Sequence, residues 1–401
     1  MVLKVLLLLN RVPYPLHDGG ALAMDAMIQG YHLARQQVYV LAMNTTRHPV
    51  PGDTLSKLYR NIAGFYTVEH DNTISGRKIV RNLIFSREPE HAERFSSGMY
   101  AARLQGLLED IQPDIVQLES PFLAGYLDLI RTHSKALIVY RMHNIESQIW
   151  NRLASGAKGL RQRYLKILSQ RVERYEHSLW KNAQLLLPIT DADAAVVRSA
   201  GIHTPMEICP FGIQLSTYEE QFPPEPFRLF HIGAMDWMPN VEAIEWFLKE
   251  VWPDIHQKIP ELSFYFAGRS MPESLGMNLP EGCYCSGEVS DAREFIHNKH
   301  ILVVPLRSGS GIRIKILEAL NDGKLVISTD IGMQGIQLED QKHYLRANSA
   351  EDFITVIHQV ALNPEWAESM ASSGQHYLRE HYNSTTIMEQ LLHRIQQFQT
   401  S

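Results

Sequence analysis

The stretch from residue 301 to residue 330, ILVVPLRSGSGIRIKILEALNDGKLVISTD, constrains the fold of this chain more than any other. It begins with an apolar run, passes through the glycine-rich sequence Ser308–Gly311, and ends in a second apolar run at Leu325–Ser328. Continuous apolar runs of this length are typical of parallel strands that are covered on both faces. The stretch therefore predicts a strand, a glycine-rich turn, a helix opening near Gly311 and a second strand, which together form one βαβ unit.

The glycine-rich turn has the composition of an anion-binding site. It leaves backbone N–H groups accessible, and the positive end of a helix dipole follows at once. Arg313 and Lys315 add positive charge in the expected first turn, and the Glu318 carboxylate can accept hydrogen bonds from sugar hydroxyls. We therefore expect a nucleotide diphosphate here. In the structural alternative, Ser310 only caps the helix and Lys315 pairs with Glu318 at i,i+3 spacing.

Length and composition indicate a globular protein of two or three domains. The chain has 401 residues, of which 45% are hydrophobic and 20% charged; this exceeds the size of one ordinary hydrophobic core. The net charge of −6 argues against a nucleic acid partner. No apolar run reaches the roughly 20 residues of a membrane span, and three cysteines fit a reducing compartment. We expect a cytoplasmic protein.

An alternation of strands and helices runs twice along the chain. The first series starts at Val2–Asn10 and the second at Phe227–Ile232, and residues 214–226 between them are polar and hold three prolines. This predicts an α/β protein of two Rossmann-like, doubly wound domains facing each other across a cleft. The expected domains are residues 1–213 and 227–380, with 214–226 as linker and 381–401 as a C-terminal helix crossing back to the first domain.

The helical segment 152–181 is strongly basic. It contains eight basic residues and two acidic ones, with interleaved apolar positions. It is either a packed helix with a solvated face, or a surface that docks on anionic lipid or an anionic acceptor. The second interpretation predicts a peripheral location at the inner face of a membrane. The basic residues are Arg152, Lys158, Arg161, Arg163, Lys166, Arg171, Arg174 and Lys181.

Motifs spread over nearly the whole chain resemble glycosyltransferase family 4, a family of retaining enzymes with the GT-B fold. The most specific is Gly309–Leu320 followed by Gly323–Ser328, which is similar to the donor-site signature of the family. The other matching segments lie at expected turns and strand ends, namely Gly19-Gly20, Ile189–Asp193, Pro210–Ile213, Phe230–Gly233 and Ala267–Arg269.

The resemblance implies a metal-independent, retaining hexosyltransferase of cell envelope polysaccharide biosynthesis. Its donor would be a nucleotide-diphosphate sugar bound by the second domain, its acceptor a glycan, a lipid-linked sugar or another molecule bound by the first, and no cofactor is expected. Glu318 would bind the ribose, Arg313 and Lys315 the diphosphate, and His143 the sugar. The remaining donor-binding residues would be Gly19, Gly20, Gly233, Gly268, Arg269, Gly309, Ser310, Gly311 and Ile312.

Two departures from the family pattern concern the donor site. Ser310 stands where the family has the first glutamate of its glutamate pair, and the segment His231–Asn240 lacks the family's arginine and lysine. The cationic role would therefore fall to Arg313 and Lys315. Two alternatives remain, a nucleotide-sugar epimerase of similar fold and a non-catalytic nucleotide-sugar-binding protein.

Overall fold

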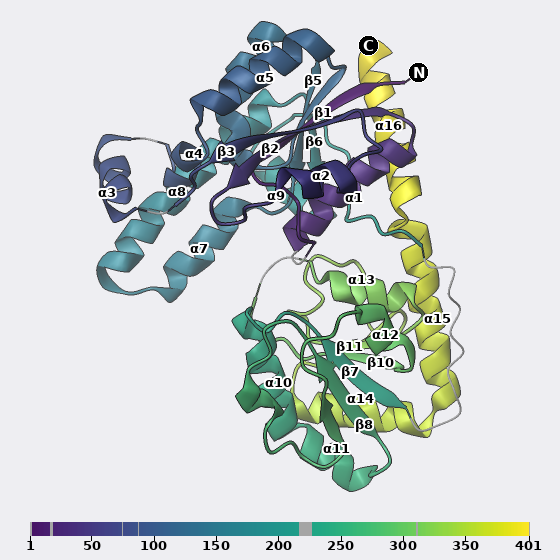
Figure 1. The fold of residues 1–401 in the computed structure, drawn as a ribbon. Coiled ribbons are helices and arrows are strands. Elements are labelled where there is room, and N and C mark those ends of the chain that lie inside the picture. The colour runs from purple at the N-terminus through teal and green to yellow at the C-terminus, as the bar shows by residue number, and fades with distance from the viewer. Residues whose placement is uncertain are drawn as a thin grey trace. The chain divides into compact units, whose positions relative to one another are not determined.

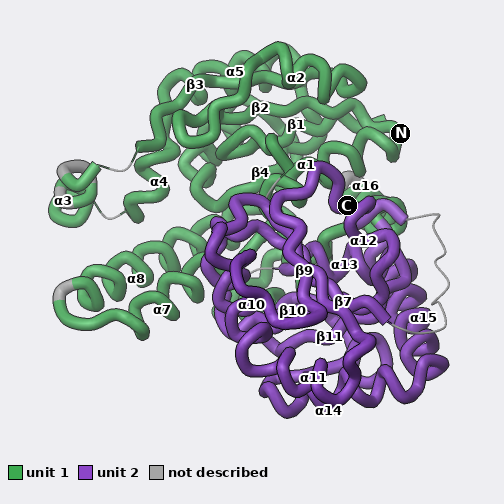
Figure 2. The backbone as a smooth tube through the Cα atoms, turned by 60° about the horizontal axis from the view of Figure 1, so that its bottom comes forward, with its two compact units in different colours: residues 1–212, 384–401 green, residues 213–383 purple. Residues whose placement is uncertain are grey.

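The computed structural model describes residues 2–16, 19–73, 75–86, 88–215, 227–309 and 312–400. The chain forms two compact units, Met1–Gly212 with Ser384–Ser401, and Ile213–Asn383 (Figure 2). Each unit contains a six-stranded sheet whose strand pairs are all parallel. This confirms the α/β class with two doubly wound sheets.

The sheet of the first unit has the order β3-β2-β1-β4-β5-β6. The chain therefore starts at the centre of the sheet, moves to one edge and then crosses to the other half. The strands are β1 (Lys4–Leu9), β2 (Gln37–Thr45), β3 (Gly64–His70), β4 (Ile115–Leu118), β5 (Leu137–Met142) and β6 (Leu185–Pro188). This order places the carboxyl ends of β1, β4 and β5 next to one another.

Helices cover both faces of this sheet because its central strand is apolar at every position. Leu6 and Leu8 of β1 face one core, and Val5 and Leu7 face the other. The helices (Figure 1) are α1 (Gly19–Leu33), α2 (Gly52–Leu58), α3 (Gly76–Phe85), α4 (Glu90–Arg94), α5 (Gly98–Ile111), α6 (Leu127–His133), α7 (Glu146–Gly156), α8 (Gly159–Asn182), α9 (Asp191–Ser199) and α16 (Ser384–Thr400), with a 3-10 turn at Pro121–Tyr126.

The C-terminal helix α16 packs against α1 of the first unit. Met388, Leu391 and Ile395 are buried in the same core as Met24 and Ile28 of α1. The first unit therefore includes the last segment of the chain, although the whole second unit lies between them in sequence.

The second unit has the strand order β12-β11-β10-β7-β8-β9. Its strands are β7 (Arg228–Ile232), β8 (Ser263–Ala267), β9 (Cys283–Cys285), β10 (Ile301–Val304), β11 (Leu325–Ser328) and β12 (Leu345–Arg346). Its helices are α10 (Met238–Glu250), α11 (Trp252–Lys258), α12 (Ala292–His297), α13 (Ile314–Asn321), α14 (Ala350–Leu362) and α15 (Pro364–His381), with a 3-10 turn at Glu273–Gly276. The topology brings the ends of β7, β8 and β10 together.

Three predicted boundaries differ from the observed ones. The segment 46–64, expected as a loop, contains α2, and the helix expected at 91–110 is divided into α4 and α5. The helix after the glycine-rich turn begins at Ile314 rather than near Gly311. None of the helices described here is both long and apolar enough to cross a membrane.

Candidate functional site

The loop between β10 and α13 is the part of the second unit that the sequence singled out. Because α13 begins at Ile314, Arg313 occupies the N-cap position instead of the first turn, while Lys315 does lie in the first turn. Ser310 and Gly311 lie outside the described residues. Of the two cations expected in the first turn, the structure therefore places only Lys315 there.

The Lys315 ammonium is held by two neutral acceptors. Nζ lies 3.0 Å from Nε2 of His231, the penultimate residue of β7, and 3.1 Å from Oδ1 of Asn240 in α10. His231 Nδ1 is 2.8 Å from the carbonyl oxygen of Val303, so Nδ1 carries the hydrogen and Nε2 accepts from Lys315. Lys315 thus does not form the ion pair with Glu318 that the spacing allows, which weighs against the structural alternative.

Burial changes the ionisation of this pair. It lowers the pKa of Lys315 well below 10.5, and the nearby Arg313 guanidinium lowers that pKa further. Burial, followed by the Lys315 charge, also holds the pKa of His231 well below 6.5, so the imidazole is neutral. Since no described carboxylate pairs with Lys315, an anion that reached Nζ would be favoured there.

Two glycines at neighbouring strand ends allow the backbone to pass close to Lys315. A Cβ added to Gly233 would lie 2.7 Å from Nδ2 of Asn240 and 3.1 Å from Nζ of Lys315. A Cβ added to Gly268 would overlap the carbonyl oxygen of Gly233. Arg269 follows directly and forms a 2.8 Å ion pair with Asp236. Only glycine fits at positions 233 and 268.

The β10–α13 loop packs on a tryptophan. The Arg313 guanidinium carbon lies 4.8 Å from the centre of the Trp237 ring, and burial lowers the pKa of Arg313 to about 10. Gly309 has a φ of 120°, and an added Cβ would lie 2.6 Å from the Trp237 ring. On the other side of the loop, a Cβ on Gly335 would lie 3.0 Å from Ile312. The loop conformation therefore depends on glycine and on Trp237.

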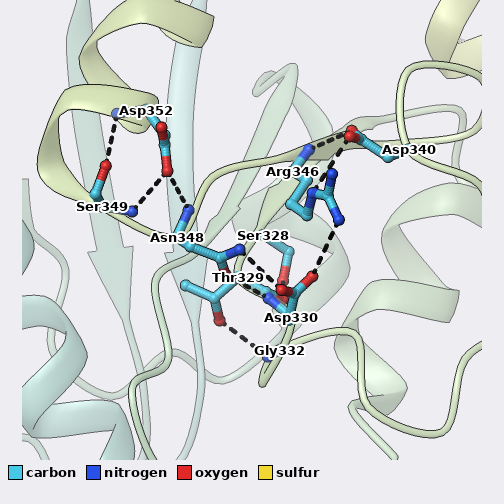
Figure 3. A network of polar contacts seen from close by, with 9 residues as sticks. All are labelled: Ser328, Thr329, Asp330, Gly332, Asp340, Arg346, Asn348, Ser349 and Asp352. Carbon is cyan, nitrogen blue, oxygen red and sulfur yellow. Dashed lines mark hydrogen bonds and ion pairs between the residues drawn. The ribbon is translucent and has the colours of Figure 1, made fainter.

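A polar network fixes the neighbouring loop, which follows β11 (Figure 3). Thr329 Oγ1 donates to the carbonyl oxygen of Leu306 at 2.6 Å, which connects this loop to the end of β10. Asp330 and Asn348 exchange two hydrogen bonds of 2.9 and 2.8 Å. The other members of the network are Ser328, Gly332, Asp340, Arg346, Ser349 and Asp352. The network gives both loops a defined backbone.

Glu318 lies on α13 with its side chain exposed. Loss of hydration beside the protein, followed by the charge of Asp322 one turn later, raises its pKa above 4.5. The carboxylate has no protein partner among the described residues, so its oxygens are available to a ligand.

In the first unit, His143 belongs to a buried charged cluster at the ends of β4 and β5. Its Nε2 lies 2.8 Å from Oε2 of Glu119, and Arg141 lies 3.3 Å from the same oxygen. Arg141 also donates to the carbonyl oxygen of Ala23 in α1, 2.9 Å away. Burial by itself would raise the pKa of Glu119, but Arg141 and His143 hold it below 4.5. The side chain of His143 is 20% exposed, whereas that of Glu119 is fully buried.

A second pair of carboxylates lies at the start of α7, just after His143. Glu176 of α8 is buried and accepts from the N–H groups of Glu146 and Ser147, at 2.7 and 2.9 Å, and so caps α7. Burial and the neighbouring Glu176 raise the pKa of Glu146 to about 7. Glu146 is therefore a carboxyl group that gains and loses a proton near neutral pH.

The expected site residues divide between the units. Gly233, Gly268, Gly309, Arg313 and Lys315 gather at the strand ends of the second unit, with Glu318 further along α13. His143 and the two glycines that begin α1, Gly19 and Gly20, belong to the first unit.

Sequence reasoning missed several polar residues that hold the expected ones. They are His231, Trp237 and Asn240 in the second unit and Glu119 and Arg141 in the first. A polar residue in or directly after an apolar strand was the available signal. Among the residues that the structure describes, no three or more His, Cys, Asp or Glu side chains are arranged to hold a metal ion.

Solved structures share this architecture along their whole length. Sucrose-phosphate synthase from Thermosynechococcus elongatus superposes with a TM-score of 0.68 at 15% identity, over 99% of this chain and 100% of that one. HepE from Anabaena, in complex with UDP-glucose, gives a TM-score of 0.66 at 14% identity, over 98% and 100%. TarM from S. aureus, in complex with UDP and α-GlcNAc-glycerol among others, gives 0.65 at 13% identity, over 98% and 100%. The chain therefore has the GT-B fold.

The second unit carries a more specific relationship. Residues 226–363 match the family model of group 1 glycosyl transferases. A protein of the Klebsiella pneumoniae cps region, described as an uncharacterized 44.6 kDa protein, is 20% identical over 173 residues. That match covers 41% of this chain and 45% of the relative, so it spans about half of each protein. The second unit therefore contains a group 1 glycosyltransferase domain.

Proposed function

We propose that this protein is a retaining, metal-independent glycosyltransferase that uses a nucleotide-diphosphate hexose. The observation that carries the proposal is the Lys315 ammonium, which is buried without a carboxylate partner at the ends of β7 and β10. It lies beside glycines that leave room for a ligand, in a domain that matches group 1 glycosyl transferases. A diphosphate would supply the missing negative charge.

The donor site assigns a role to each group that surrounds the β10–α13 loop. Lys315 and Arg313 neutralise the diphosphate, and Glu318 accepts hydrogen bonds from the ribose hydroxyls. Gly233, Gly268 and the loop 309–312 let the backbone approach the donor, with Arg269 beside them. The structural relatives HepE and TarM, crystallised with UDP-glucose and with UDP, support a nucleotide-sugar donor.

In the transfer step, the bond between the anomeric carbon and the diphosphate oxygen breaks while the acceptor oxygen bonds to the same carbon. The acceptor proton passes to the departing phosphate oxygen, so the products are a glycoside and a nucleoside diphosphate. Lys315 and Arg313 stabilise the negative charge that develops on the leaving group. Because two protein cations perform this task, the proposal requires no metal.

The first unit would bind the acceptor. His143, aimed by the buried Glu119, would contact the transferred sugar, and Gly19 and Gly20 at the start of α1 would let the backbone approach the donor phosphates. The cps-region relative supports a glycan or lipid-linked acceptor of cell envelope polysaccharide synthesis, and hence a cytoplasmic enzyme.

The experiment incubates the protein with a panel of UDP-, GDP- and ADP-hexoses, with and without candidate acceptors, and measures released nucleoside diphosphate. Transfer in the presence of EDTA, with an α-linked product from an α-linked donor, is the expected result. Conversion of the donor sugar without acceptor would instead identify an epimerase. Binding without any turnover would identify a non-catalytic binding protein, the alternative that Ser310 motivates.

Site variants connect this activity to the described residues. Lys315→Ala and Glu318→Ala should each lower kcat/KM by at least about 10-fold with melting temperatures close to wild type, because each removes a contact to the donor. Lys342→Ala is the matched control, since Lys342 is an exposed lysine of the same unit, paired with Glu339. If the control lost as much activity, the assignment of Lys315 would be wrong.

A further inference from the structure

The exposed face of α8 carries a row of basic side chains. Arg163, Lys166, Arg174 and Lys181 are exposed, and so is Ile167 among them. At about 100° per residue, these positions fall within roughly one third of the helix circumference. The opposite face is buried through residues that include Leu165, Leu168, Val172 and Leu179. The row therefore faces solvent along several helical turns.

Helix α3 is fastened to one flank of this row. Arg171 of α8 donates to the carbonyl oxygens of Asn82 and Leu83, at 3.2 and 2.9 Å, and Asn82 is itself buried. The side chain of Asn82 also bonds the carbonyl oxygen of Glu88 at 3.1 Å. These bonds hold the C-terminal end of α3 beside α8.

That end of α3 exposes large apolar side chains. Ile84 is 65% exposed and Phe85 is 83% exposed, which is the largest exposure of a hydrophobic side chain among the described residues. Arg81, one turn earlier, is exposed as well. Burying such side chains would remove an unfavourable contact with water.

The local charge opposes the charge of the whole protein. The net charge of the chain is −6, yet α3 and α8 together expose Arg81, Arg163, Lys166, Arg174 and Lys181. Glu173 is the exposed acidic residue of α8, and its other acidic residue, Glu176, is buried as the cap of α7. This surface is therefore a cationic region of an anionic protein.

We propose that this surface docks on a lipid bilayer that contains anionic lipids. The lipid-docking surface consists of Arg81, Ile84, Phe85, Arg163, Lys166, Ile167, Arg174 and Lys181. The cations would lie among anionic headgroups, while Ile84, Phe85 and Ile167 would enter the boundary of the acyl chains. A soluble polyanion would satisfy the cations but would leave Phe85 in water, so the combination favours a membrane. The inference does not depend on the transferase activity.

The first test measures co-sedimentation of the full chain with vesicles of phosphatidylcholine alone and with 30% phosphatidylglycerol. Binding to the anionic vesicles only, and its loss in high salt, is expected. The variant Arg163→Glu/Lys166→Glu/Arg174→Glu should reduce partitioning by about 100-fold or more, since each basic residue contributes about tenfold near an anionic surface. Lys57→Glu/Arg60→Glu/Lys135→Glu changes the same charge at exposed sites elsewhere in this unit and should bind like wild type.

The second test asks whether α3 enters the bilayer. In Phe85→Trp, fluorescence should shift to the blue and be quenched by lipids brominated on the acyl chain, whereas the same protein with heparin should show neither effect. Ile84→Ser/Phe85→Ser should weaken vesicle binding at low salt while leaving heparin binding unchanged. Circular dichroism and thermal melting confirm that each variant is folded.

Three results would overturn the proposal. They are equal partitioning into neutral and anionic vesicles, equal loss of binding in the control triple variant, and a tryptophan at position 85 that brominated lipid does not quench. Heparin binding that persists when vesicle binding is absent would identify a soluble anionic partner instead.

Discussion

Nζ of Lys315 lies 3.0 Å from Nε2 of His231, and the carbonyl oxygen of Val303 lies 2.8 Å from the other nitrogen of the same ring. These two contacts fix the imidazole as a neutral acceptor. They join α13, β7 and β10, so the position of the ammonium is set by three elements at once. A cation held by neutral groups keeps its charge available to an incoming anion.

Replacing Lys315 with methionine should separate ligand binding from stability. The change removes a cation whose burial is costly but leaves His231 and Asn240 without a donor, and these effects oppose each other. We expect the free energy of unfolding to change by only about 1 kcal/mol, while nucleoside diphosphate binding weakens about 10- to 100-fold. Urea denaturation and calorimetry measure the two quantities. Unchanged nucleotide affinity would remove Lys315 from the donor site.

Nucleoside diphosphate binding should be coupled to proton uptake. The pKa of Lys315 is lowered in the free protein by burial and then by Arg313, and a bound diphosphate would raise it again. The bound state therefore holds more protons, so affinity should fall as pH rises through the pKa of the free lysine. Calorimetry in two buffers of different ionisation enthalpy measures the uptake directly. Lys315→Met should abolish the buffer dependence; if it persisted, another group would be responsible.

The pKa of Glu146, raised to about 7, makes a prediction about stability. Between pH 4.5 and 7 the folded protein holds a proton that the unfolded chain has lost, so this residue makes stability fall as pH rises. Glu146→Gln removes the dependence and should be more stable than wild type by about 1–3 kcal/mol at pH 8, with little difference at pH 4.5. Urea denaturation at both pH values tests this. A difference that does not depend on pH would contradict the assignment.

Glu119 and His143 should respond differently to substitution. Glu119→Gln removes the charge that compensates the buried Arg141, and should cost about 3–5 kcal/mol of stability. His143 is partly exposed, so His143→Gln should leave the melting temperature nearly unchanged but lower kcat about 10-fold or more. Thermal melting and steady-state kinetics on both variants separate the roles. Equal destabilisation by the two changes would make His143 a structural residue.

The amino-acid sequence by itself determined the fold class and most of the elements. Continuous apolar strands such as β1 and β10 are specified locally, because nearly every side chain must be apolar when both faces of a sheet are covered. The group around the β10–α13 loop was also visible, since glycines and cations at one strand end form a local pattern. Arg313 was misplaced because the exact start of a helix depends on packing, here against Trp237.

Only the tertiary structure decided which groups meet. His231 and Lys315 are 84 residues apart, and Glu119 and His143 are 24 apart, so no local pattern connects either pair. The order of parallel strands brings their carboxyl ends together, and that order depends on how the helices pack on the two faces. The same is true of α3 and α8, which Arg171 joins across 88 residues. The sequence specified the cations, and the packing of distant elements determined which acceptors hold Lys315 and which apolar side chains lie beside α8.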